Sequence, residues 1–174
     1  MYETRTDLWR EQLSPAGTIR TGALVALDTS VDRLIVYDWE PAAPLTYEFD
    51  LASSTWMDEG VATPEMGFDL VWGVPTARGE MAYDEARART VIFSQGHAIA
   101  YDASAHAWQT VLDPNDEQSS APGNRSSLWL VYDAVNERLL VVGGWHSAVY
   151  ATRDLVAFDL GDNSWTVLVE PSAP

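Results

Sequence analysis

The residues best suited to acid–base chemistry are three Asp and Arg pairs of identical spacing. Each Asp is followed five positions later by an Arg, in DTSVDR from Asp28, DEARAR from Asp84 and DAVNER from Asp133. A carboxylate and a guanidinium at this spacing could move a proton, bind an anion or pair with each other. Because an active site rarely occurs in triplicate, we expect a turn hydrogen bond or a hairpin ion pair, which contributes about 0–1 kcal/mol where it is exposed.

Other residue types with reactive side chains show no catalytic spacing. The three histidines, His97, His106 and His146, lie in different parts of the chain and match no HExxH pattern. No G-x-S-x-G, Walker or dinucleotide-binding glycine pattern is present. Cysteine is absent, which excludes disulfides, thiolate metal sites and cysteine nucleophiles. We therefore predict no catalytic residue, no metal site and no cofactor.

A repeated pattern must position these side chains. An aromatic residue, an acid, five further residues and a Trp occur in this order four times. The copies run from Tyr2 to Trp9, from Phe49 to Trp56, from Tyr101 to Trp108 and from Phe158 to Trp165. The Trp residues are 47, 52 and 57 positions apart, a period typical of repeat architectures. A Pro and then an Arg precede each unit, at Pro15 and Arg20, Pro75 and Arg78, and Pro122 and Arg125.

Short apolar runs between these signals predict β-strands. They are rich in Val, Ile, Leu and Tyr and show no sustained period of 3.6. We predict three meanders of four strands, named a, b, c and d in chain order. The predicted strands cover 22–28, 33–38, 44–50 and 54–57, then 79–84, 89–94, 97–102 and 107–112, then 127–133, 138–143, 153–159 and 164–169. The blurred alternation in LWLVYD, residues 128–133, predicts strands covered on both faces, as in a stack of sheets.

The stretch from Asn124 to Leu168 shows the pattern most clearly, and its strand b ends in Gly143 and Gly144, which permit positive φ. The aromatic, the Trp six residues beyond it and the Gly-Gly resemble the Kelch motif. Bacterial Kelch proteins often carry the P-x-x-R and Y-D-x4-R patterns as well. The resemblance covers nearly the whole chain, but Asp38-Trp39 and Ser94-Gln95 replace the double glycine in the first two units.

The resemblance implies an all-β chain of β-propeller blades, in which each sheet stacks on its neighbours. The predicted single segment, 1–174, comprises a half blade at 2–13 and full blades at 20–58, 76–112 and 125–169. A propeller ring usually needs four to eight blades. The chain is therefore expected to be a segment of a longer propeller, or to self-associate so that two copies supply six blades. The periodic Trp residues are expected in the core between blades.

Candidate binding residues lie where loop length varies. The a–b and c–d turns keep a constant length, whereas the b–c and d–a connections differ between units, and such variable loops often carry binding residues. We expect a site on that side of the blades, formed by aromatic side chains beside charged groups. The candidates are Trp39, Glu40, Trp72, His97, Trp145, His146 and Arg153. Structural roles, such as capping blade ends or pinning a loop, remain an alternative for the three Trp residues.

Composition limits the function further. The formal net charge is −16, from 26 acidic and ten basic residues, which argues against binding nucleic acid. No apolar run approaches 18 residues and the polar start MYETRTDLWREQ does not resemble a signal peptide, so we expect no membrane span. As given the chain would be cytoplasmic, and secreted if it belongs to a longer exported protein.

We expect a non-catalytic scaffold whose b–c and d–a loops bind a protein, peptide or carbohydrate. The alternative is a non-catalytic segment of a larger Kelch-propeller carbohydrate-active enzyme. Galactose oxidase, a Kelch-bearing enzyme, requires a Tyr–Cys cross-link that this cysteine-free chain cannot form.

Overall fold

Every described element is a β-strand. The structure is a computed structural model, and it describes residues 2–3, 8–9, 19, 22–38, 44–57, 61–62, 79–94, 97–112, 125–146 and 150–170. This part of the chain contains no helix, and hence none long and apolar enough to cross a membrane.

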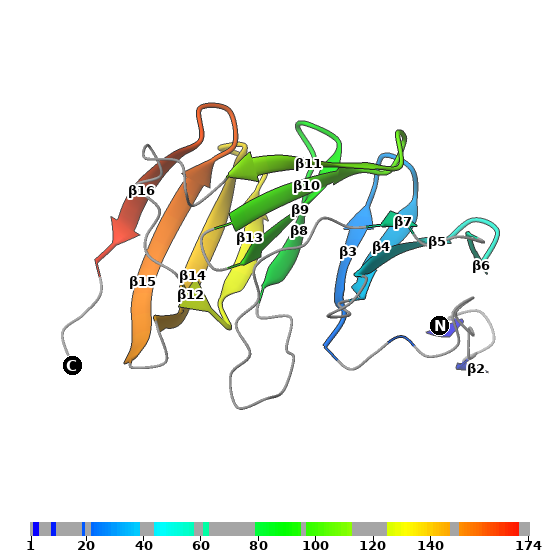
Figure 1. The fold of residues 1–174 in the computed structure, drawn as a ribbon, viewed down its shortest axis with the longest axis horizontal. Coiled ribbons are helices and arrows are strands. Elements are labelled where there is room, and N and C mark those ends of the chain that lie inside the picture. Colours follow the sequence, from blue (N-terminus) through cyan, green and yellow to red (C-terminus); the bar gives the residue numbers. More distant parts are fainter. Residues whose placement is uncertain are drawn as a thin grey trace.

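Three antiparallel meanders follow one another along the chain (Figure 1). The first sheet contains β3 (Leu24–Asp28), β4 (Arg33–Asp38), β5 (Leu45–Asp50) and β6 (Thr55–Trp56). The second contains β8 (Glu80–Asp84), β9 (Arg89–Ser94), β10 (His97–Asp102) and β11 (Ala107–Leu112). The third contains β13 (Trp129–Asp133), β14 (Arg138–His146), β15 (Tyr150–Asp159) and β16 (Ser164–Val169). The predicted all-β class and the three four-stranded sheets are confirmed.

Two short strands extend these meanders. β7 (Val61–Ala62) resumes pairing with β5 beyond β6, and β12 (Arg125–Ser126) pairs with the far end of β14. A separate two-stranded sheet joins β1 (Tyr2–Glu3) to β2 (Leu8–Trp9). Its register pairs Tyr2 with Trp9, as β10 and β11 pair Tyr101 with Trp108. The first copy of the aromatic and Trp pattern is therefore also a hairpin.

The a–b and c–d turns share one design. In all three sheets, an Asp closes the strand, four residues turn, and the last of the four has positive φ. These positive-φ residues are Asp32, Ser54, Ala88, His106, Glu137 and Asn163, with φ between 48° and 57°. In five of the six turns, the Asp that closes the strand accepts a hydrogen bond from a backbone N–H two or three residues on, as Asp102 does from Ser104 and Ala105. Asp suits this position because its carboxylate satisfies turn N–H groups that no strand reaches.

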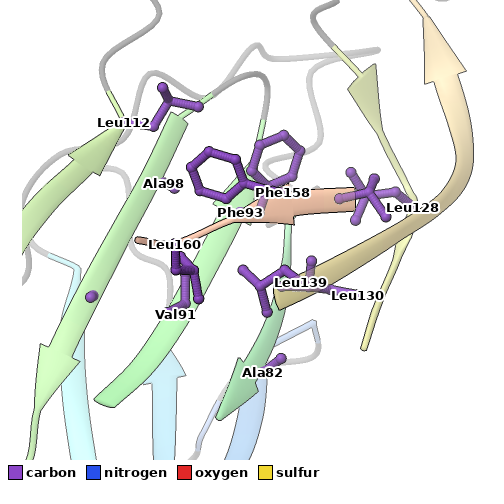
Figure 2. Packing of buried hydrophobic residues seen from close by; sticks show 12 residues of the cluster. Ala82, Val91, Phe93, Ala98, Leu112, Leu128, Leu130, Leu139, Phe158 and Leu160 are labelled. Atoms are coloured by element: carbon purple, nitrogen blue, oxygen red, sulfur yellow. The ribbon is translucent and has the colours of Figure 1, made fainter. Parts of the chain in front are cut away.

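The core lies between successive sheets. Buried Val91 and Phe93 of the second sheet pack against Leu139 and Phe158 of the third, as Figure 2 shows. The same arrangement joins the first sheet to the second, where Ile35 and Tyr37 pack with Met81, Ile92, Ile99 and Tyr101. Strand β8 lies against both β3 and β13, so the first strands of the three sheets are neighbours. The second sheet therefore buries one face against the first sheet and the other against the third.

The periodic Trp residues hold these interfaces from a half-buried position. Trp56, Trp108 and Trp165 are partly exposed, and each packs on its cross-strand aromatic, with ring centroids 5.1, 5.0 and 4.4 Å apart. Trp108 and Trp165 also lie edge-on to Tyr37 and Phe93 of the preceding sheet. The predicted interface role is confirmed for these two residues. The fourth Trp, Trp9, lies in β2, and its side chain is outside the described part.

The prediction that LWLVYD is covered on both faces is wrong. Leu128 and Leu130 are buried against the second sheet, but Trp129 and Val131 are 73% and 52% exposed. The two faces of β13 are therefore distinct, because within the described residues no sheet packs on the side opposite the second sheet.

Candidate functional site

The predicted site residues fall into two groups. Trp39, Glu40 and Trp72 lie outside the described residues. His97 begins β10 directly opposite Ser94, while Trp145, His146 and Arg153 belong to the third sheet. The side chain of His146 is likewise outside the described part. The candidate site can therefore be built from His97, Trp145 and Arg153.

The connection between the predicted strands 138–143 and 153–159 is mostly strand. Strands β14 and β15 contain 9 and 10 residues, compared with 6 in each of the corresponding strands of the other two sheets. Trp145 pairs with Ala151, and Gly144 with Thr152, beyond a register shift between Val142 and Gly144. The b–c hairpin of the third sheet is thus longer than the sequence predicts.

The two glycines explain how the strands continue past this irregularity. Gly143 and Gly144 have φ of 59° and 114°, so the prediction of positive φ is confirmed. A Cβ on Gly143 would lie 3.1 Å from the carbonyl oxygen of Thr152. The bulge therefore requires a residue without a side chain. The hydroxyl of Thr152 donates to the carbonyl of Gly144 at 3.2 Å and ties the hairpin together beyond the bulge.

A buried ion pair fixes the base of this hairpin. The guanidinium of Arg125 donates to both carboxylate oxygens of Asp154, at 2.8 and 2.9 Å, and also to the carbonyl of Gly143 at 3.2 Å. Both side chains are buried. Burial raises the pKa of Asp154, but the hydrogen bonds and charge of Arg125 outweigh it and hold this pKa below its ordinary value. Arg125 therefore joins β12, the bulge and β15 into one rigid unit.

Sequence reasoning marked Arg125 as part of a Pro and Arg signal but did not find Asp154. Asp154 lies in the strand predicted at 153–159, and no sequence pattern singled it out. Its partner lies 29 positions earlier, and only the pairing of β12 with β14 brings the two together. The repeated P-x-x-R signal was the one available indication that this arginine has a fixed partner.

Beyond this anchor the hairpin presents an exposed aromatic and a cation. Trp145 is 50% exposed, and Ala151 and Arg153 are exposed as well. Arg153 lies two residues beyond Ala151, the cross-strand partner of Trp145, next to the register shift of the hairpin. The arrangement can stack a flat apolar surface and pair with an anionic or hydrogen-bonding group.

The second sheet contributes unpaired polar atoms at its b–c end. Nδ1 of His97 and Oγ of Ser94 are buried, and neither has a hydrogen-bond partner among the described residues. Buried polar atoms in proteins are generally satisfied by protein, water or ligand. These two atoms can therefore accept or donate a hydrogen bond from outside the sheet.

The Asp and Arg pairs lie at the opposite end of the sheets and are structural. Arg89 contacts Asp84 at 3.2 Å, and Arg138 contacts Asp133 at 3.1 Å, which confirms the predicted hairpin ion pairs for two of three units. Arg33 instead pairs with Glu48 at 2.8 Å. No group of three or more His, Asp or Glu side chains within the described ranges could hold a metal ion.

Comparison with known proteins identifies the fold alone. No family model matches the chain, and no curated protein matches it. Among solved structures, the chain is similar to TolB from Acinetobacter baumannii, with a TM-score of 0.53 and 11% identity over 87% of this chain and 33% of that one. It is also similar to YjhT, with a TM-score of 0.55 and 14% identity over 86% of this chain and 51% of that one. The chain thus spans about a third and about half of these structures. Both are β-propeller-type folds, and the three four-stranded sheets correspond to propeller blades.

Proposed function

We propose that the chain is a non-catalytic binding scaffold of Kelch-like blades, which takes a protein, peptide or glycan ligand at the b–c and d–a end of its sheets. The observation that carries this proposal is the half-exposed Trp145 on a hairpin held by the buried Arg125 and Asp154 pair. A large aromatic costs free energy when exposed to water, and a rigid one loses little entropy when a ligand covers it.

The neighbouring groups support the same assignment. Arg153 presents a planar guanidinium that can bind a carboxylate or a sugar hydroxyl pair, and Trp145 can stack on a sugar ring or a peptide side chain. Ser94 and His97 supply unpaired polar atoms at the same end of the second sheet. Trp39, Glu40, Trp72 and His146 complete the proposed set from the sequence. The blade bounds proposed for this scaffold remain 2–13, 20–58, 76–112 and 125–169.

A second function follows from the lengths of the similar structures. Because the chain spans about half of YjhT and a third of TolB, it is compatible with a segment of a larger propeller. Combined with the Kelch resemblance, this supports the alternative proposal that the chain is the non-catalytic part of a larger carbohydrate-active enzyme. The two functions differ in whether the isolated 174-residue chain binds a ligand by itself.

Glycan and peptide arrays test the proposal on the wild-type chain and on Trp145→Ala and Arg153→Ala. We expect the wild type to select one ligand class and each variant to lose at least about tenfold in affinity. Arg138→Ala is the control, because it removes an arginine from the opposite end of the same sheet. Unchanged binding by both variants would contradict the site, and a wild type that binds nothing would favour the larger enzyme.

A further inference from the structure

The third sheet has an apolar face that no described residue covers. Trp129, Val142, Leu155 and Val169 are direct cross-strand partners and form one row across all four strands. Trp129, Val142 and Val169 are exposed, and Val131 lies two residues along β13 on the same side. We call this surface, formed by Trp129, Val131, Val142, Leu155 and Val169, the trailing face.

The equivalent row in each earlier sheet is buried by the next sheet. In the second sheet, counting from the turn Asp, the row contains Glu80, Phe93, Ala98 and Leu112. Glu80 is half-buried, and the three apolar residues are buried in the cluster shared with the third sheet. In the first sheet it contains Leu24, Tyr37 and Val61, which pack in the cluster shared with the second. The trailing face is thus a repeat interface without its partner.

The first sheet leaves the complementary surface open along β3. Val25 occupies the position of Met81 and Leu130, counted from the turn Asp, and those two residues are buried against the preceding sheet. Val25 is instead 53% exposed, and Leu27 beside it is exposed as well. We call Val25 and Leu27 the leading edge. Val36 and Tyr47, in the same row as Val25, are already buried, so the opening is confined to β3.

Both open surfaces carry an apolar side chain near the a–b turn. At the two existing interfaces, a Tyr reaches the a–b turn of the preceding sheet: Tyr83 bonds Ser30, and the Tyr132 hydroxyl accepts from Ala86 N at 3.2 Å. At the leading edge, Leu27 occupies the position of this Tyr, directly before the turn Asp. In the a–b turn of the third sheet, Val135 occupies the position of Ser30 and Ala86, two residues after the turn Asp. Val135 is 91% exposed. Leu27 cannot make the polar contact of the Tyr hydroxyl, and Val135 presents an exposed apolar side chain at the facing turn.

We infer that the trailing face of one copy binds the leading edge of a second copy of this chain. The trailing face and the leading edge lie in the last and first of the three sheets and are the two unmatched sides of the same repeat interface, so a second copy can supply a partner to each. In this head-to-tail interface β13 of one copy lies beside β3 of the other, as β8 lies beside β3 and β13 within the chain. Two such interfaces would close a pair of chains into one ring of six full blades.

The net charge makes this association depend on the salt concentration. The trailing face and the leading edge contain no ionisable residue, so no charged group needs to be desolvated within them. Each copy nevertheless has a formal charge of −16, and long-range repulsion opposes pairing at low salt. The dimer is expected to dissociate as the salt concentration is lowered.

Light scattering with size exclusion on the 174-residue chain tests the inference. We expect a mass of twice 19.2 kDa for the wild type and 19.2 kDa for either Val131→Glu or Val25→Glu. Ala105→Glu, in an exposed turn of the second sheet, adds the same charge and should leave the dimer intact. Far-UV circular dichroism checks that each variant folds.

Mixing the two variants distinguishes head-to-tail pairing from a symmetric contact. The Val25→Glu copy keeps its trailing face, and the Val131→Glu copy keeps its leading edge. Their mixture should form a 1:1 complex through the one remaining interface, at higher concentration than the wild type needs. A monomeric wild type would overturn the inference. So would a Val25→Glu variant that stays dimeric while Val131→Glu dissociates, because that result indicates two trailing faces in contact.

Discussion

The hydroxyl of Tyr101 donates a 2.5 Å hydrogen bond to Oε1 of Glu48, across the interface between the second and first sheets. Glu48 is buried, and its other carboxylate oxygen accepts from Arg33 at 2.8 Å. His106 lies 2.7 Å from the same Oε1. This carboxylate is thus the polar centre of an otherwise apolar interface, and it bonds to side chains from both sheets.

Replacing Tyr101 by Phe should weaken this interface. Removing a donor from a buried carboxylate costs about 1.5–3 kcal/mol, so the free energy of unfolding should fall by that amount in a urea titration. Ser53→Ala is the control, because it removes a hydroxyl that donates to the exposed carboxylate of Asp50 at 2.8 Å and should cost less. Equal losses for the two variants would show that Glu48 does not depend on Tyr101.

The same tyrosine predicts alkaline behaviour. Burial raises the pKa of Tyr101 above its ordinary value of 10, and the Glu48 hydrogen bond and charge raise it further. A raised pKa in the folded state stabilises the fold below pH 10, and this contribution is lost as the pH rises above 10. Urea titrations between pH 9 and pH 11 should therefore show a steeper fall in stability for the wild type than for Tyr101→Phe. Parallel curves would contradict this assignment.

The turn design makes a prediction about glycine. Ala88 has a φ of 48°, a conformation that costs a non-glycine residue about 1–2 kcal/mol. Ala88→Gly should therefore raise the free energy of unfolding by about 0.5–1 kcal/mol, after the added entropy of glycine in the unfolded chain. Ala86, exposed in the same turn without positive φ, is the control, and Ala86→Gly should lower stability. Chemical unfolding gives the free energy of unfolding of both variants. A lower value for Ala88→Gly than for the wild type would contradict the positive φ of Ala88 in this turn.

Acid sensitivity should depend on Asp154. Because Arg125 lowers the pKa of Asp154 in the folded state, the ion pair contributes its full stability above the ordinary pKa of 3.8 and loses it as the pH falls through the lower folded value. Asp154→Asn should cost about 3 kcal/mol at pH 6, because it leaves Arg125 buried without its carboxylate. The difference from wild type should shrink below pH 3.8, as measured by urea unfolding at pH 6 and pH 3. A difference independent of pH would contradict the pairing.

Trp108 should be among the most sensitive positions. It packs on Tyr101, contacts Tyr37 and donates from Nε1 to the hydroxyl of Thr46 at 3.1 Å. Trp108→Ala removes this contact between sheets and should cost about 3 kcal/mol by thermal or chemical unfolding. A loss below about 1 kcal/mol would show that the periodic Trp residues do not hold the sheets together.

Local signals predicted the strands well. The Asp that closes each hairpin and the constant turn length placed most strands to within two residues, since both features depend only on neighbouring residues. Pairing that depends on distant residues was missed. Strand β7 resumes after a break in strand d, and β12 is defined by its partner β14. The apolar run LWLVYD predicted Trp129 to be a core residue. Its burial, however, requires a further sheet on that face, which a local pattern cannot reveal.

For the candidate site, the sequence predicted individual residues but not the hairpin that carries them. Trp145 and Arg153 were expected at the b–c connection of the third unit, with Arg153 at the start of the strand 153–159. The sequence could not reveal the hairpin, because the bulge at Gly143 and Gly144 resembles a strand end until its partner Thr152 is placed. The partnership of Arg125 with Asp154 is a tertiary contact without a local pattern.

The most direct test of the binding proposal compares stability and affinity in Trp145→Ala. Because Trp145 is half exposed at the end of a hairpin that Arg125 and Asp154 anchor, its removal should change the free energy of unfolding by less than about 1 kcal/mol. Calorimetric titration with the ligand class selected on the arrays should show at least about a tenfold loss of affinity. A variant that binds like the wild type, or one as unstable as Trp108→Ala, would contradict the account.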